Sequence, residues 1–128
     1  MAAEEGKATI LRFVEARNSN NIDDAVACWV AEERDGLRHA FAMITTAFPD
    51  VHITAEDLIG EGDKVALRWT LRGTHQGPFQ GIPPTGRTVE WPGVDLYTVE
   101  GGQISRLVRG ADLLTLLQQL DVAAPPVK

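Results

Sequence analysis

The sequence has little of several features that would point to particular partners or compartments. It contains one cysteine, Cys28, so no disulfide can form within the chain, and a reducing compartment such as the cytoplasm is expected. No basic run exceeds two residues and the net charge is −6, which argues against nucleic acid or an anionic membrane as a partner. No uninterrupted apolar stretch reaches the roughly 18 residues of a membrane-spanning helix. The N-terminus is acidic before it is apolar, unlike a secretory signal.

What the chain does have is the composition of an ordinary globular domain. Hydrophobic residues make up 44% of its 128 residues and charged residues 23%, which is the usual balance. This length suffices for one hydrophobic core. We therefore expect a single domain over residues 1–122 and a flexible C-terminal tail over residues 123–128, AAPPVK.

The first half of the sequence has the period of amphipathic helices. Apolar residues recur on one face of three segments, residues 4–17, 22–30 and 37–48, as expected of helices that pack on a core. Asparagines at 18–21 separate the first two segments, and Pro49 ends the third. Trp29 lies on the apolar face of the second segment, which predicts a core residue. Three N-terminal helices are thus expected.

From residue 50 onward apolar residues recur at every second position, which is typical of half-buried antiparallel strands. Four segments alternate in this way, residues 51–59, 65–72, 88–99 and 103–109. Tight turns are expected at Glu61–Asp63 and Glu100–Gly102. Pro92 and Gly93 interrupt the third segment and predict a bulge or a sharp bend there.

The order of these segments predicts an α+β fold rather than alternating strands and helices. Leucines on one face mark a short C-terminal helix (Leu113, Leu116, Leu117 and Leu120). We expect three N-terminal helices packed against a curved antiparallel sheet of about four strands, with the last helix closing the fold. Such an arrangement is a cone with a pocket inside.

The segment between the second and third strands, GTHQGPFQGIPPTGR (residues 73–87), is rich in glycine and proline. Glycine permits positive φ and proline stiffens the chain, so an ordered loop is expected. Its histidine, His75, is a candidate to reach a ligand. The alternative is that His75 satisfies backbone groups of the loop itself.

Four pieces together resemble the SnoaL-like polyketide cyclase family of the nuclear transport factor 2-like superfamily: AFPDVHITAEDLIGEGDKVALRWTLRGTH, GIPPTGR, GVDLYTVEGGQI and DLLTLLQQL. The resemblance runs from about Gly36 to Leu120, with the pieces in the family's order and spacing. It implies the cone fold, with the glycine- and proline-rich loop at its rim. It also implies acid–base catalysis of an intramolecular aldol closure, without metal or cofactor.

The resemblance places the family's catalytic aspartate at Arg109 and its partner histidine at Asp95, so both residue types have changed. We expect Asp95 and Arg109 to point into one cavity from neighbouring strands. There Asp95 would act as a base and Arg109 would hold a developing enolate oxygen. The alternative is an interior ion pair that does no chemistry.

Five further side chains are candidates to bind a small apolar molecule: Tyr97, Trp91, Trp69, His75 and His39. Tyr97 and Trp91 fall in register with Asp95, and their rings could stack on a flat ligand. A core position is the alternative for Trp69, and a surface position for His39. No spacing of histidine, cysteine and acidic residues fits a metal site, and no glycine-rich phosphate motif is present, so no metal or cofactor is expected.

The mouth of the cone and the outer face of the sheet suggest a homodimer. Relatives carry a longer link between the second and third helices, and only residues 31–35 remain for it here. The short link predicts a wider or differently capped mouth, closed by a neighbouring subunit. The sheet's outer face carries apolar residues, and relatives commonly pair through such faces.

Two functions stay open from the sequence. The first is a cofactor-free cyclase or isomerase that moves protons on an apolar, carbonyl-bearing molecule of polyketide or terpenoid type. The second is a non-catalytic binding or assembly module, because both expected catalytic types have changed. Epoxide hydrolysis of the limonene-epoxide type is not expected, since Arg68-Trp69-Thr70 keeps the arginine of that motif and lacks its aspartate.

Overall fold

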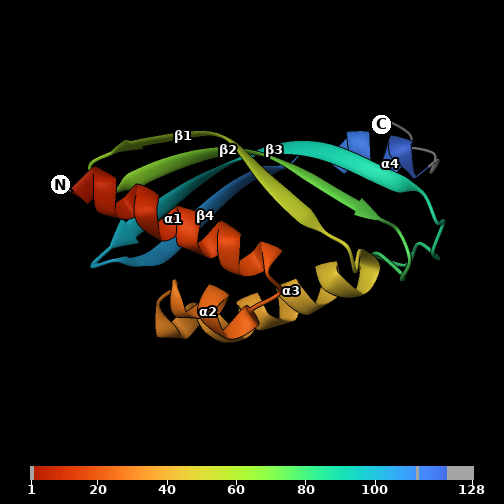
Figure 1. Ribbon diagram of the computed structural model, residues 1–128, viewed down its shortest axis with the longest axis horizontal. Coiled ribbons are helices and arrows are strands. Elements are labelled where there is room, and N and C mark those ends of the chain that lie inside the picture. The colour runs from red at the N-terminus through yellow and green to blue at the C-terminus, as the bar shows by residue number, and fades with distance from the viewer. Residues whose placement is uncertain (1, 112, 121–128) are drawn as a thin grey trace, which may run out of the picture.

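The computed structural model describes residues 2–111 and 113–120. Its elements in chain order are α1 (Ala2–Asn18), α2 (Ile22–Ala27), the short 3₁₀ helix η1 (Ala31–Glu33), α3 (Arg34–Ala47), β1 (His52–Glu61), β2 (Lys64–Thr74), β3 (Thr88–Glu100), β4 (Gln103–Ala111) and α4 (Leu113–Gln119). The strands form one antiparallel sheet in the order β1-β2-β3-β4. The sheet arches over α1, α2 and α3 (Figure 1). The predicted α+β cone is confirmed, and the predicted tail lies outside the described residues.

The second helix is shorter than the sequence predicts, because the chain leaves it to pair with β4. Trp29 was expected on this helix, but it forms an isolated parallel bridge with Ile104. The Val30 N–H donates to the Ile104 carbonyl at 3.0 Å, and the Ile104 N–H donates to the Cys28 carbonyl at 2.7 Å. Trp29 is nevertheless a buried core residue, as predicted. The shortened link therefore fastens α2 to the edge of the sheet.

The core lies between α1 and the inner face of the sheet. Phe13 of α1, Trp29 and Tyr97 of β3 meet edge to face, with ring centroids 5.7–6.4 Å apart, a favoured aromatic geometry. Asn18, the last residue of α1, binds the backbone of Ile53 twice. Its amide donates to the Ile53 carbonyl and accepts from the Ile53 N–H, both at 2.8 Å. This side chain fixes the end of α1 against the start of β1.

The predicted bulge at Pro92 and Gly93 is wrong, because the register of β2 and β3 runs through both residues without a shift. Gly93 is opposite Trp69, and a Cβ at Gly93 would overlap the indole ring. The pairing of β3 with β4 ends at Gly93, so Pro92 lies beyond that ladder. The side-chain amide of Gln119 in α4 instead binds the N–H and carbonyl of Glu90. Backbone groups of residues 90 and 92 point to this same side, so the missing N–H of Pro92 breaks no bond with β2.

Two register shifts elsewhere in the sheet accompany its curvature. In one, Glu56 is the extra residue on β1, and in the other, Ser105 is the extra residue on β4, opposite Thr98 and Val99. An extra residue on one strand of an antiparallel pair bends that strand and increases its twist. β3 itself carries no extra residue, so its inner face is continuous where the sequence predicted a break.

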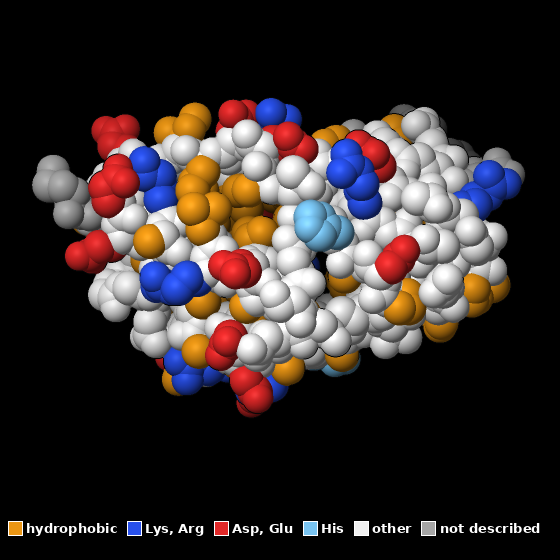
Figure 2. All heavy atoms as spheres, in the orientation of Figure 1, with side chains coloured by type: hydrophobic (Ala, Val, Ile, Leu, Met, Phe, Trp, Pro, Cys, Tyr) orange, Lys and Arg blue, Asp and Glu red, His pale blue; other side chains and the backbone are white. Residues whose placement is uncertain are grey.

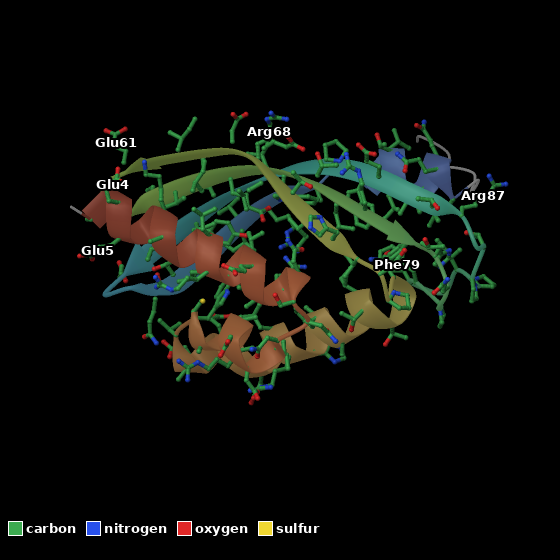
Figure 3. The ribbon with its side chains drawn as sticks, viewed as in Figure 1. Glu4, Glu5, Glu61, Arg68, Phe79 and Arg87 are labelled. Atoms are coloured by element: carbon green, nitrogen blue, oxygen red, sulfur yellow. The ribbon has the colours of Figure 1, made fainter. Side chains whose placement is uncertain are left out.

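The loop over residues 75–87 is ordered by its own hydrogen bonds, as the sequence predicts. The His75 N–H donates to the Arg87 carbonyl at 2.9 Å, and the Gly86 N–H donates to the His75 carbonyl at 2.8 Å. Gly81 and Gly86 have positive φ values of 81° and 72°, which glycine adopts without strain. The loop places Phe79 between the sheet and the end of α3 (Figure 3).

Helix α3 covers the inner side of the sheet only loosely. Of its 14 residues only Ala47 is buried, while Leu37 and Ile44 are half-buried and Met43 is exposed. Space therefore remains between α3 and the sheet.

On the face shown in Figure 2, hydrophobic side chains gather left of centre, between α1 and β1, among acidic and basic side chains. Within the described part of the chain, no helix is long and apolar enough to cross a membrane.

Candidate functional site

A cavity of about 460 Å³ lies inside the cone, between the concave face of the sheet, the end of α1 and helix α3. Its apolar wall comes from every layer of the fold (Val14, Ile53, Leu67, Leu71, Phe79 and Leu116). This volume lies in the usual range of small-molecule sites, which are mostly apolar with a few polar groups. The polar groups of this wall include Arg17, Asp95, Tyr97 and Arg109.

Asp95 and Arg109 lie opposite each other on β3 and β4 and line this one cavity, as predicted. The Arg109 Nε–H donates to Asp95 Oδ1 at 3.4 Å. The Asp95 side chain is 2% exposed and that of Arg109 is 48% exposed. The carboxylate is thus fixed inside the wall, while the guanidinium is partly open to solvent.

Tyr97, two residues along β3, shares the inner face with Asp95 and lines the cavity as predicted. Its hydroxyl donates to Asp95 Oδ2 at 2.9 Å. Burial, and then the charge of Asp95, raise the pKa of Tyr97 well above its ordinary value of 10.0. The ring therefore remains a neutral hydrogen-bond donor at physiological pH, and it orients the carboxylate.

Trp69 and Trp91 both contribute to the cavity wall, where the sequence predicts them. Each is almost completely buried, so both also belong to the core. The Trp69 ring lies over Gly93, which is why the third strand carries glycine at that position. Within the described residues its buried Nε1–H has no acceptor. Two flat indole rings in the wall suit contact with a flat apolar ligand.

The two histidine predictions are not supported by the structure. His75 is fully buried in the loop, outside the cavity wall, where its Nδ1 lies 3.0 Å from Thr85 Oγ1 and accepts from the Thr85 N–H at 3.2 Å. It therefore satisfies the loop's own polar groups. His39 is exposed on α3 and lines a separate surface hollow with Pro78 and Gln80, because it lies on the side of the helix away from the sheet.

Sequence reasoning missed Arg17, which lines the cavity from the end of α1. Its guanidinium carbon lies 5.6 Å from the ring centroid of Phe13 and 5.9 Å from that of Phe41. Burial lowers the pKa of Arg17 from 12.5 to about 10, so the group stays charged at neutral pH. The helical spacing could have identified Arg17 as a wall residue, because it follows Ile10 by seven residues and Phe13 by four and so lies on the apolar stripe of α1.

A second cavity of about 380 Å³ adjoins the first, between α3, η1 and β4. The two cavities share four wall residues: Arg17, Ala40, Ile44 and Arg109. Trp29 lies in the wall of the second cavity, and its buried Nε1–H has no acceptor among the described residues. The two arginines therefore stand where both cavities meet.

The arched four-stranded sheet with helices on its concave side, enclosing an apolar cavity with a few charged groups, defines the nuclear transport factor 2-like fold. Solved structures with this architecture superimpose on most of the chain. TsrD from Streptomyces laurentii has a TM-score of 0.88 and 27% identity, covering 94% of this chain and 97% of that one. AclR from Streptomyces galilaeus, proposed to be a hydroxylase, has a TM-score of 0.84 and 28% identity, covering 93% and 97%.

A third structure is that of IdmH from Streptomyces antibioticus, proposed to be a polyketide cyclase. It has a TM-score of 0.77 and 30% identity, covering 91% of this chain and 99% of that one. The sequence model of the SnoaL-like polyketide cyclase family matches residues 8–120. The chain therefore belongs to the SnoaL-like polyketide cyclase family. No curated protein matches the sequence significantly.

Arg68, the arginine that resembles part of an epoxide hydrolase motif, is not in the cavity. It points away from the helices on the outer face of the sheet (Figure 3). There it donates to Asp57 Oδ2 at 2.6 Å. This position agrees with the expectation that the chain lacks that hydrolase arrangement.

Proposed function

We propose that the chain is a cofactor-free cyclase or isomerase that moves a proton on an apolar, carbonyl-bearing molecule of polyketide or terpenoid type. The observation that carries this proposal is the buried carboxylate of Asp95 in an apolar cavity, with Arg109 opposite it. Membership of the cyclase family supports the substrate class. Trp69 and Trp91 would hold the flat part of the molecule, and Phe79 would close the cavity beneath the loop.

In this mechanism the Asp95 carboxylate removes a proton from the carbon next to a carbonyl group. The electron pair of the broken C–H bond moves to the carbonyl oxygen, and Arg109 stabilises the resulting enolate by hydrogen bonding. In a cyclisation the enolate carbon then attacks a second carbonyl group, and the new alkoxide takes the proton from Asp95. In an isomerisation the enolate is conjugated with a C=C bond, and Asp95 returns the proton to the far carbon of that conjugated system. Tyr97 holds Oδ2 of Asp95 by hydrogen bonding, so Oδ1 is the oxygen that faces Arg109 and the reacting carbon.

The test measures proton transfer with α-tetralone, a bicyclic ketone with acidic hydrogens next to its carbonyl. Exchange of these hydrogens in heavy water is followed by NMR. We expect the wild-type chain to accelerate exchange, and Asp95→Asn to lower the catalysed rate by about 100-fold or more. We expect Arg109→Leu to lower it by about 100-fold, as loss of one oxyanion donor does elsewhere. Arg68→Leu, on the outer face, is the matched control and should leave the rate unchanged.

The competing function is a non-catalytic binding module, and the observation that favours it is the replacement of both catalytic types at positions 95 and 109. In that case α-tetralone would quench the fluorescence of Trp69 and Trp91 on binding, yet exchange would proceed at the rate of the protein-free solution. Catalysed exchange that survives both Asp95→Asn and Arg109→Leu would contradict the roles given to these residues.

The partner proposal is a homodimer formed through the outer face of the sheet. Val94 and Leu96 of β3 and Val108 of β4 are 43–53% exposed, and Leu96 is paired directly with Val108. Charged side chains of both signs border this apolar patch, such as the ion pair of Arg68 with Asp57. A twofold axis through the patch would bring two copies of the same surface together, with opposite charges able to meet at its rim.

A further inference from the structure

The charges around the two cavities do not balance. Two guanidinium groups, of Arg17 and Arg109, lie where the cavities meet. The carboxylate of Asp95 is the only acidic group in the wall of the main cavity among the described residues. The wall of the adjoining cavity adds Glu33 and Arg106, so among the described residues the two walls together hold three cations and two anions, with one positive charge in excess. Withdrawing an ionised group from water without a partner is costly, and Arg17 is half-buried, so an anion in the cavity would supply the partner that it lacks.

Arg17 is the cation without an acidic partner. Its contacts within the described chain are the rings of Phe13 and Phe41, and no acceptor for its N–H groups lies within hydrogen-bond distance there. A guanidinium has five N–H donors in a planar fork. Aromatic faces attract its charge but accept none of these hydrogen bonds well. The donors of Arg17 are therefore available to a molecule in the cavities whose wall this residue forms.

Asp95 cannot neutralise both arginines. Its Oδ2 already accepts from Tyr97 at 2.9 Å, and its Oδ1 accepts one N–H, from Arg109 Nε, at 3.4 Å. That single, long hydrogen bond leaves the terminal nitrogens of Arg109 without an acceptor in the described chain. Among the described residues, both arginines thus have free donors on the wall that the two cavities share.

We infer that Arg17 and Arg109 form a subsite for the carboxylate of an aromatic or polycyclic acid, whose ring system lies in the main cavity between Trp69 and Trp91. One carboxylate supplies the single negative charge that the wall lacks, and its two oxygens match the fork of a guanidinium. A phosphate would bring more negative charge than the wall can balance. The inference rests on the proposed function only in placing the ligand in the main cavity, and it names the acidic class of that ligand.

The test compares naphthoate with its uncharged methyl ester, two ligands of the same ring size. Binding is measured by calorimetry at neutral pH, with inorganic phosphate as a third probe. We expect wild type to bind naphthoate about tenfold or more tightly than the ester, the ratio that one charge-assisted hydrogen bond gives. Arg17→Gln should reduce this preference to about twofold or less, and Arg17→Lys, which keeps the charge, should retain part of it. Arg68→Gln is the control and should keep the full preference.

Asp95→Asn separates this inference from the proposed catalysis. Removing the carboxylate leaves the two arginines unopposed, so this variant should bind naphthoate more tightly than wild type while it loses proton exchange on α-tetralone. Failure of exchange in wild type overturns the proposed function alone. Any of three results overturns the carboxylate subsite alone. They are equal affinity of wild type for naphthoate and its ester, no binding of naphthoate, and an unchanged preference in Arg17→Gln. Phosphate binding as tight as that of naphthoate also overturns it, because the site would then accept any anion. Circular dichroism confirms that each variant is folded, and the Asp95→Asn arm gives an answer even if Arg17→Gln unfolds.

Discussion

The two oxygens of Asp95 have different neighbours, and in the proposed mechanism this difference decides which of them would react. Oδ2 is held by the buried hydroxyl of Tyr97, whereas Oδ1 faces Arg109, whose side chain is 48% exposed. The exposed partner can move and the buried one cannot without unpacking the core. Oδ1 is therefore the oxygen that can exchange Arg109 for a ligand. The proposed chemistry would depend on this asymmetry within one carboxylate.

The hydroxyl of Tyr97 gives a direct measurement of this environment, because it is the only tyrosine in the chain. Burial and the charge of Asp95 raise its pKa above 10.0. We expect the ultraviolet absorbance of tyrosinate to appear at clearly higher pH in the native chain than in the chain unfolded in urea. The native state excludes the ionised ring, so this contribution to stability is complete below about pH 10 and is lost as pH rises above it.

Tyr97→Phe is the control for that measurement. The phenylalanine ring cannot ionise, so the advantage of wild type over Tyr97→Phe in free energy of unfolding should shrink as pH rises above 10.0, the ordinary pKa of tyrosine. Denaturant titrations of both chains at several alkaline pH values give this difference. A native tyrosinate that forms at the same pH as in urea would show that the hydroxyl is not buried beside Asp95.

At the scale of elements, β3 supplies the buried polar groups of the main cavity wall, Asp95 and Tyr97. Trp91, Asp95 and Tyr97 lie on its inner face, with Gly93 between them. That face is continuous because the Trp69 ring from β2 fills the place of a side chain at Gly93. Where β4 ends, α4 takes over the free edge of β3 through Gln119. The strand is thus held on both edges along its cavity-lining length.

Gly93→Ala tests the contact that keeps this strand straight. The new methyl group would overlap the Trp69 ring, so the ring or the strand must shift, and such overpacking costs about 1–3 kcal/mol. Urea denaturation measures the loss. Gly36→Ala in α3 is the matched control, because its methyl group meets nothing within 4 Å and alanine favours the helix by up to about 1 kcal/mol. Wild-type stability in Gly93→Ala would mean that Trp69 does not lie over residue 93.

On the scale of the whole molecule, the sheet separates two surfaces with different roles. Its concave face and the loosely packed α3 enclose the two cavities. Its convex face carries the apolar patch of Val94, Leu96 and Val108. A dimer through the convex face would leave the mouth of the cone free for small molecules, so this partner would not be the neighbouring subunit that the short link predicts at the mouth. The proposed dimer and the proposed catalysis therefore use different surfaces and can be tested independently.

Leu96→Glu tests the dimer. A charge in the middle of the patch would have to be buried without a partner, which opposes association strongly. We expect sedimentation equilibrium to give twice the mass of one chain, 13.9 kDa, for wild type, and the mass of one chain for Leu96→Glu. Leu11→Glu is the control, since Leu11 is also exposed, at 47%, but belongs to α1, on the other side of the sheet. A wild-type mass equal to one chain contradicts the dimer.

Much of the architecture could be predicted from local pattern, and the errors have physical causes. The helical and two-residue periods located the helices and strands, because burial on one face is a local property of the sequence. The bulge at Pro92 was wrong because a proline beyond the end of a neighbouring strand breaks no ladder, and where β4 ends is a property of the sheet. The length of α2 was wrong because pairing with Ile104 overrode the helical pattern.

Part of the candidate site could likewise be predicted from the sequence, and part could not. The register of Asp95, Tyr97 and Trp91 could be predicted, since residues two apart on a strand share a face. The position of Arg109 opposite Asp95 came from the family resemblance. Arg17 could have been found from helical spacing, but nothing local shows that its face of α1 borders a cavity. For His75 the sequence suggested contact with a ligand, whereas in the structure its ring accepts a hydrogen bond from the Thr85 N–H within the loop.

The sequence by itself determined which segments are helices, which are strands and which faces are apolar, because these follow from spacing along the chain. Only the tertiary structure decided that α3 leaves space against the sheet, that one carboxylate faces two arginines, and that neither histidine candidate reaches the cavity. Those properties depend on distances between residues far apart in the chain. Packing, rather than periodicity, sets such distances.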